Sequence, residues 1–298
     1  MTTAHAPAAS PRRRRRDRTP LVLLLPALAM LLVFIGWPLV QLIVMSFQKY
    51  GREQVFGKPP TFAWFDNYVR VLTDSEFWVV LARSFGLMVV CAAATMVLGV
   101  AIALMMTSLG RVMRTVVSVG LLLAWAMPAL TGTIVWGWIF DTSYGLVNYA
   151  LTRITGQNWI GHSWLSDPLS FFGVAAIIIT WGAIPFVAFS TYAGLSQVPD
   201  EVLEAASLDG SGAWQRFRFI VVPYIRSILV VLLILQVIWD LRVFAQIYAP
   251  NTIGVYIYSV SMATGDLGSG GAISVILVVV LLAISAYYIR TMLTSEDD

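Results

Sequence analysis

Six long apolar runs limit what this 298-residue sequence can fold into. Each run is long enough to cross a hydrocarbon core of about 30 Å as an α-helix rising about 1.5 Å per residue. The runs are continuously apolar, without the alternation of membrane β-strands. We therefore predict an all-α integral membrane protein with six transmembrane helices, at about residues 21–47, 77–106, 112–140, 171–195, 225–249 and 272–289.

The composition agrees with a membrane protein. Hydrophobic residues make up 58% of the chain and charged residues only 12%, about half the charged share of soluble domains. A single cysteine, Cys91, excludes an intrachain disulfide, and two histidines leave little for a metal site. The internal prolines predict kinks rather than breaks, because neighbouring helices can satisfy the freed carbonyls. They are Pro26, Pro38, Pro128 and Pro185.

Residues 1–18 form a basic segment with no apolar face to bury, so we expect a disordered tail ahead of a transmembrane domain at 19–298. The apolar run that follows is far longer than the core of a secretory signal, about 7–15 residues, which predicts an uncleaved first span. Arginines concentrate in the tail and in every second loop. By the positive-inside rule both termini and the 199–223 loop are expected on the cytosolic side of the membrane.

The stretch 199–223 is polar, although it lies between two apolar runs. Its pattern predicts two short helices joined at Gly210, with Pro199 at the first helical position and acidic residues in the first turn. Ser211 is expected to cap the second helix, and Pro223 to bend the chain into the next span. Trp214 and Phe217 are expected to pack the second helix onto the bundle. Two amphipathic helices in one connection indicate a docking surface.

The sequence lacks the motifs of an enzyme. The segment from Gly51 to Pro59 resembles a phosphate-binding loop, but it has one residue too many between its glycines and Pro59 where the magnesium-binding hydroxyl belongs. Nucleophile-elbow, zinc-protease and Cys/His cluster motifs are also missing from the sequence. The chain is therefore predicted not to be an enzyme, and any ATP hydrolysis is expected on another chain.

The 199–223 loop resembles the "EAA" loop of permease subunits in binding-protein-dependent ABC importers. That loop reads Glu-Ala-Ala, three residues, Gly, nine residues and Ile-x-Leu-Pro, and this chain matches its spacing with Val222 in place of Leu. The resemblance extends over the second to sixth spans, and the wider context of the loop, residues 193–214, is similar to the carbohydrate-importer branch. The opening segment, from Leu24 to Phe47, is similar to the first of the two permeases that such importers pair. The residues that the resemblance assigns to ATPase docking are Glu204, Ala205, Ala206, Asp209, Gly210, Ile220 and Pro223.

The resemblance implies a permease that moves a sugar or oligosaccharide by alternating access. The first short helix of the loop would be a coupling helix, seated in a groove of one of two cytosolic ATPase subunits. A second permease, expected to form a heterodimer with this chain, would complete the translocation path. An extracytoplasmic solute-binding protein would deliver the solute. This chain would carry no cofactor, since ATP and magnesium belong to the ATPase partner. The family's Gly-rich loop after the fifth span is missing from this sequence, so no loop contact with the binding protein is inferred.

Polar residues within the fifth apolar run form a second candidate site. Charged side chains cost about 2.5–3.5 kcal/mol each inside a span, so they normally face a partner or a wet cavity. Helical spacing places Arg242 and Gln246 on one helix face, with Trp239 near that face and Asp240 turned away from it. Carboxyl, amide, guanidinium and aromatic groups suit sugar recognition. Together with Trp181 in the fourth run, these residues are candidates for the substrate path; an inter-helix ion pair or contact with the second permease is the alternative.

Three other functions fit parts of the pattern. The same architecture could import a polyol phosphate or another polar solute. A self-contained ion-coupled transporter would move solute without an ATPase. A membrane enzyme would need a clustered polar site facing one membrane surface, and the sequence shows none. The sequence alone does not identify the sugar.

Overall fold

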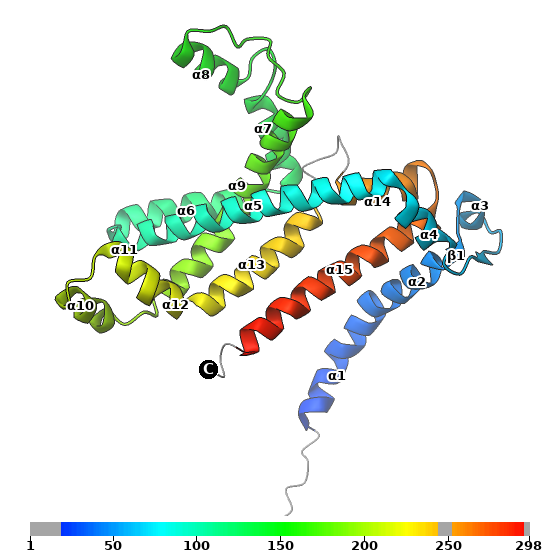
Figure 1. The fold of residues 1–298 in the computed structure, drawn as a ribbon, viewed down its shortest axis with the longest axis horizontal. Coiled ribbons are helices and arrows are strands. Elements are labelled where there is room, and N and C mark those ends of the chain that lie inside the picture. The colour runs from blue at the N-terminus through cyan, green and yellow to red at the C-terminus, as the bar shows by residue number, and fades with distance from the viewer. Residues whose placement is uncertain (1–18, 244–251, 295–298) are drawn as a thin grey trace, which may run out of the picture.

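The computed structural model describes residues 19–243 and 252–294, which are mostly helical (Figure 1). The basic tail at 1–18 lies outside the described residues. The apolar helices are α1 (Thr19–Leu31), η1 (Leu32–Gly36), α2 (Trp37–Ser46), α5 (Ser75–Ser108), α6 (Arg111–Ala126), α7 (Ala129–Ile139), α9 (Pro168–Leu195), α13 (Arg226–Leu241) and α15 (Leu267–Thr294). The connecting elements are β1 (Gln48–Lys49), α3 (Arg52–Val55), β2 (Thr61–Phe62), α4 (Asp66–Thr73), α8 (Leu146–Thr155), α10 (Asp200–Leu208), α11 (Ala213–Arg216), η2 (Phe217–Val221), α12 (Val222–Tyr224), α14 (Ile253–Tyr258) and η3 (Ser259–Ala263).

The described chain contains four helices that are long and apolar enough to cross a membrane, and two bent helix pairs bring the number to six. The four are Leu23–Ser46, α5, α9 and Leu267–Arg290. The first span continues through the π-helix η1, where the N–H of Trp37 donates to the carbonyl of Leu32. Pro38 follows this turn and has no N–H to donate, which is a common cause of such local widening. The six predicted apolar spans therefore correspond to these four helices and the two bent pairs, with each bent pair taken as one span.

The third span differs from the expectation of a kinked but continuous helix. It is divided into α6 and α7, which are bent by 104° at Met127 and Pro128. Met127 is extended, with φ −73° and ψ 124°, because the ring of Pro128 disfavours a helical conformation in the residue before it. Figure 1 shows the consequence, since α7 and α8 project away from the α5–α6 pair. The proline breaks this helix instead of kinking it.

The fifth span is shorter than predicted. Helix α13 ends at Leu241, although the apolar run was expected to remain helical to residue 249. Arg242 forms a turn and Val243 has no regular structure, while residues 244–251 lie outside the described part of the chain. The short helix α14, which sequence reasoning did not anticipate, follows at Ile253. Hydropathy detects the apolar run but does not show where its helix ends.

The most extensive packing lies between α5 and α9, where glycine permits close approach. Gly99 of α5 is buried, and a Cβ placed on it would lie 2.6 Å from Cγ1 and 2.8 Å from Cβ of Val187 on α9. Val187 and its neighbour Ala188 are fully buried. Cys91 also packs in this interface, against Ala175 and Ile179.

We predict that Gly99→Val destabilises the protein by forcing α5 away from α9. Overpacking a core costs about 1–3 kcal/mol, which lowers the melting temperature of a chain of this size by about 5 °C. Gly120→Val in α6 is the matched control, since a Cβ there meets nothing within 4 Å. Thermal unfolding of the detergent-solubilised protein measures both variants. Equal melting temperatures for the two would contradict this account of the α5–α9 contact.

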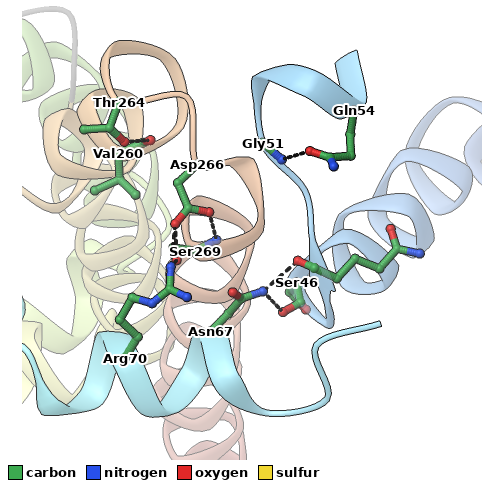
Figure 2. Close-up of polar contacts among 10 residues, drawn as sticks. Ser46, Gly51, Gln54, Asn67, Arg70, Val260, Thr264, Asp266 and Ser269 are labelled. Carbon is green, nitrogen blue, oxygen red and sulfur yellow. Dashed lines mark hydrogen bonds and ion pairs between the residues drawn. The ribbon is translucent and has the colours of Figure 1, made fainter. Parts of the chain in front are cut away.

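At the end of the bundle opposite α10, residues 46–74 form polar contacts with the start of α15 (Figures 1 and 2). Arg70 Nη1 donates to Asp266 Oδ2 at 2.9 Å, and Asn67 Nδ2 donates to the carbonyls of Ser46 and Gln48, each at 2.9 Å. Strands β1 and β2 pair antiparallel beside these contacts. The polar contacts therefore hold this end of the first span against α15.

Candidate coupling loop and transmembrane cavity

The 199–223 loop folds as two short helices with a sharp reversal between them, as predicted. Helix α10 ends at Leu208, and Gly210 has φ +81°. This left-handed conformation is strained for residues with a side chain and free for glycine. Pro199 is the residue before the first helical position instead of occupying it, and Asp200 and Glu201 form the acidic first turn. Glycine thus sets the reversal that presents α10 at one end of the molecule (Figure 1).

Ser211 closes the first helix rather than capping the second, which corrects the prediction. Its backbone N–H and its Oγ both donate to the carbonyl of Ala206, at 3.0 and 2.6 Å. The second helix has Gly212 at its start, whose N–H donates to Gln215 Oε1 at 2.9 Å. Because the reversal at Gly210 turns Ser211 back onto α10, its hydroxyl reaches the last free carbonyls of that helix.

The far side of the loop is anchored to the bundle. Phe217 packs against a buried cluster that includes Val198, Val221 and Ile225. Trp214 is 71% exposed, and its ring lies beside that of Phe217, with ring centroids 5.5 Å apart. The prediction that both rings pack on the bundle is therefore wrong for Trp214. Pro223 lies near the start of α12, and the chain bends by 73° into α13, as predicted.

The predicted docking residues mostly lie on the open side of the loop. Glu204, Ala205, Asp209 and Gly210 are exposed, and Ala206 is half-buried. Farther along the loop, Ile220 is half-buried in η2 and Pro223 is exposed. In the described part of the chain the ion pairs are Glu53–Lys58 and Arg70–Asp266, so the Glu204 carboxylate is left available to a partner. Leu208, at the tip of α10, is 90% exposed.

A cavity of about 530 Å³ lies between α6, α7, α9 and α13. Its wall brings together four of the five predicted substrate-path residues: Trp181, Trp239, Asp240 and Arg242. The break at Pro128 helps to form it, because Met127, Ala129 and Gly132 also contribute to the lining. Trp181 is held edge-to-face against Trp136, with ring centroids 5.8 Å apart. The volume is in the range of small-molecule sites.

Asp240 is the most constrained polar group in this cavity. The residue is 5% exposed, and its Oδ1 accepts a hydrogen bond of 2.8 Å from Nε2 of Gln236, which is 1% exposed. Its Oδ2 is buried without a hydrogen-bond partner. A buried polar atom without a partner is costly, so Oδ2 is an unsatisfied acceptor on a residue that lines the cavity. Gln236 was missed from the sequence, although a polar residue four positions before Asp240 in an apolar run was the available signal.

Arg242 and Gln246 do not form the predicted helical face. Because α13 ends at Leu241, helical spacing does not apply beyond it, and Gln246 lies outside the described residues. Arg242 is exposed at the cavity and forms no ion pair with Asp240. Asp240, which was expected to point away from the face of Arg242 and Gln246, lines the cavity with Arg242. In residues 19–243 and 252–294 we find no cluster of three His, Cys, Asp or Glu side chains suited to a metal ion.

The chain combines helices long and apolar enough to span a membrane with a two-helix loop and a mainly apolar cavity that contains Gln236, Asp240 and Arg242. The chain belongs to the family of binding-protein-dependent transport system inner membrane components, whose sequence profile matches residues 95–295. The match covers the cavity helices and the 199–223 loop, so both candidate sites lie within the family domain.

Relatives match along nearly the whole chain. It is 39% identical to the diacetylchitobiose uptake system permease protein of Streptomyces coelicolor, over 94% of this chain and 88% of that one. It is 31% identical to the trehalose/maltose transport system permease protein of Thermococcus litoralis, over 93% and 94%. Among solved structures, a bacterial ABC transporter that imports the acidic polysaccharide alginate matches with a TM-score of 0.78 and 21% identity, over 93% and 95% of the chains. At that identity the likeness concerns the fold.

Proposed function

We propose that this protein is the permease subunit of an ATP-driven importer for a sugar or oligosaccharide. The observation that carries the proposal is the cavity lined by Trp181, Trp239 and Asp240 inside a family permease fold. Aromatic faces can stack on the apolar side of a sugar ring, and Asp240 can accept a bond from a hydroxyl. The diacetylchitobiose and trehalose/maltose permeases among its relatives support a carbohydrate as the solute.

The 199–223 loop is proposed as the ATPase-docking element. The exposed Glu204 offers a carboxylate for charge-assisted bonds, and Ala205 and Ala206 leave room for a closely approaching surface. The exposed side chains of Leu208 and Trp214 add apolar area to the same loop. ATP and magnesium would be held by the separate ATPase, and this chain would hold neither. Two such ATPase subunits and a second permease, as a heterodimer, would complete the assembly.

Orientation and delivery complete the proposal. The arginine bias favours a bacterial plasma membrane with both termini and α10 on the cytosolic side. The opposite end, where residues 46–74 meet α15, then faces outward. An extracytoplasmic solute-binding protein is proposed to deliver the sugar there. A solved alginate transporter with the same fold is in complex with an alginate pentasaccharide-bound periplasmic protein.

Reconstitution tests this function. Proteoliposomes are prepared with this chain alone, and with this chain together with the permease, ATPase and solute-binding protein encoded beside it. Uptake of radiolabelled disaccharides and of glycerol phosphate is then measured with internal ATP. We expect ATP-dependent sugar uptake by the complete set alone. Uptake by the single chain would support an ion-coupled transporter, and uptake of glycerol phosphate in preference to sugars would assign a polyol phosphate instead.

A further inference from the structure

A second groove lies on the outside of the bundle, between α5 and α9, and is separate from the transmembrane cavity. Its volume is about 490 Å³, and its lining is apolar except for one arginine. From α5 it is lined by Arg83, Gly86, Leu87 and Val90, and from α9 by Leu169, Phe172, Gly173 and Ala176. On each helix these positions follow the i, i+3, i+4, i+7 spacing of one helical face.

The two glycines leave the groove open. A Cβ on either Gly86 or Gly173 would meet nothing within 4 Å, so the space above them is unfilled. Leu169 is 82% exposed and Val90 is 56% exposed along its sides. The groove is therefore an open apolar surface depression along two membrane-spanning helices, with Arg83 at one end.

Arg83 has no partner for its charge within the described residues. It is exposed, and the ion pairs and cation–π contacts found in that part of the chain involve other cations. An arginine in a membrane span normally pairs with a carboxylate, a carbonyl or a group at the membrane surface. The groove residues supply no such group. Within the described residues the charge of Arg83 is therefore left for a partner from outside them.

The depth of Arg83 identifies the class of partner. Helix α5 has 34 residues, about 51 Å at 1.5 Å per residue, and so exceeds a hydrocarbon core of about 30 Å by about 10 Å at each end. Arg83 lies about 12 Å from the first residue of α5. With the hydrocarbon core centred on α5, the Cα of Arg83 lies at the edge of the core, and the long side chain can extend to the level of the lipid phosphates.

We propose that this groove is a binding site for a phospholipid, whose phosphate pairs with Arg83 and whose acyl chain lies between Gly86 and Gly173. A bilayer already holds phosphates at this depth and acyl chains below them, so one phospholipid can satisfy both the charge of Arg83 and the apolar lining of the groove. Anionic headgroups are favoured over zwitterionic ones, because each basic residue near the surface attracts anionic lipid.

Native mass spectrometry of the detergent-purified transporter, titrated with dioleoylphosphatidylglycerol, tests the proposal. The wild type is expected to hold one lipid more tightly than the rest. Arg83→Gln should weaken that lipid about fivefold, and Gly173→Leu should displace it by filling the groove. Dioleoylphosphatidylcholine should bind more weakly and respond less to Arg83→Gln. Gly86→Leu fills the groove from the opposite helix and takes the place of Gly173→Leu if that variant does not fold.

Two control variants match the test variants. Arg153→Gln removes a cation in α8, away from the groove, and Gly120→Leu adds a side chain to an open position in α6; both should bind lipid as the wild type does. Unchanged lipid affinity in Arg83→Gln would overturn the proposal. So would loss of a co-purifying protein subunit from the groove variants with lipid binding intact, since the groove would then accommodate a protein helix.

Discussion

Gly210→Val is expected to abolish uptake while the protein still inserts and folds in the membrane. Gly210 has φ +81° at the reversal between α10 and α11, a conformation that costs residues with a side chain about 1–2 kcal/mol and β-branched residues more. Valine would shift the chain out of this conformation and move α10 away from its present position. Under the proposed coupling role, uptake should fall by roughly tenfold or more, because the ATPase and the permease would no longer be mechanically linked.

Two variants separate the backbone conformation from other effects at this reversal. Gly210→Asn should retain much of the uptake, because asparagine tolerates the left-handed conformation better than other residues. Gly212→Ala is the neighbouring control, since Gly212 has φ −69° and its substitution requires no strained conformation. Uptake of labelled sugar and ATPase co-purification are measured in parallel with membrane insertion. Normal uptake and ATPase retention in Gly210→Val would remove the coupling role from this loop.

Glu204→Lys tests the same interface through charge instead of backbone shape. Glu204 is exposed and outside the ion pairs of the described chain, so its reversal should leave the permease fold intact. If basic groups of the ATPase bind it, the substitution should weaken ATPase co-purification and reduce uptake about as strongly as Gly210→Val. ATPase binding that survives the charge reversal would place the docking contacts elsewhere on the loop.

The sequence predicted the spans and the coupling loop because both depend on local signals. Continuous apolar runs locate membrane helices, and glycine at residue 210 locates a reversal that few other residues can adopt. The 104° break at Pro128 was underestimated, since a proline signals a bend but its size depends on what the two helix segments pack against. Ser211 was assigned to the wrong helix for a related reason. Its hydroxyl partner is fixed by the reversal and not by its place in the sequence.

The cavity was predicted in part, because its residues come from three separate spans. Trp239, Asp240 and Arg242 were recognisable as polar or aromatic groups in one apolar run, and Trp181 was added from another. Their convergence with Gln236 depends on how α9 packs against α13, which periodicity does not reveal. The position of Arg242 could not follow from helical spacing once α13 had ended at Leu241. Tertiary packing decides both points.

The second large effect is expected from Asp240→Asn, which should sharply reduce sugar uptake without disturbing the fold. Asparagine has the same shape and keeps an oxygen to accept the 2.8 Å bond from Gln236 Nε2. Its amide nitrogen replaces the unpartnered Oδ2 and turns a buried acceptor on the wall of the cavity into a donor. If Oδ2 accepts a bond from a sugar hydroxyl, this exchange removes that bond and leaves a hydroxyl without its acceptor.

The loss of a hydrogen bond to a charged or buried group corresponds to about a 10- to 100-fold reduction in uptake at low sugar concentration. Asp74→Asn is the matched control, because Asp74 accepts a bond from the Tyr256 hydroxyl at 2.8 Å at the first turn of α5, outside the cavity. Uptake is measured as a function of sugar concentration beside thermal stability and ATPase co-purification. A structural role for Asp240 predicts that stability and assembly fall together with uptake. A role in the sugar path predicts that uptake alone falls, and that the Asp74 variant transports as the wild type does.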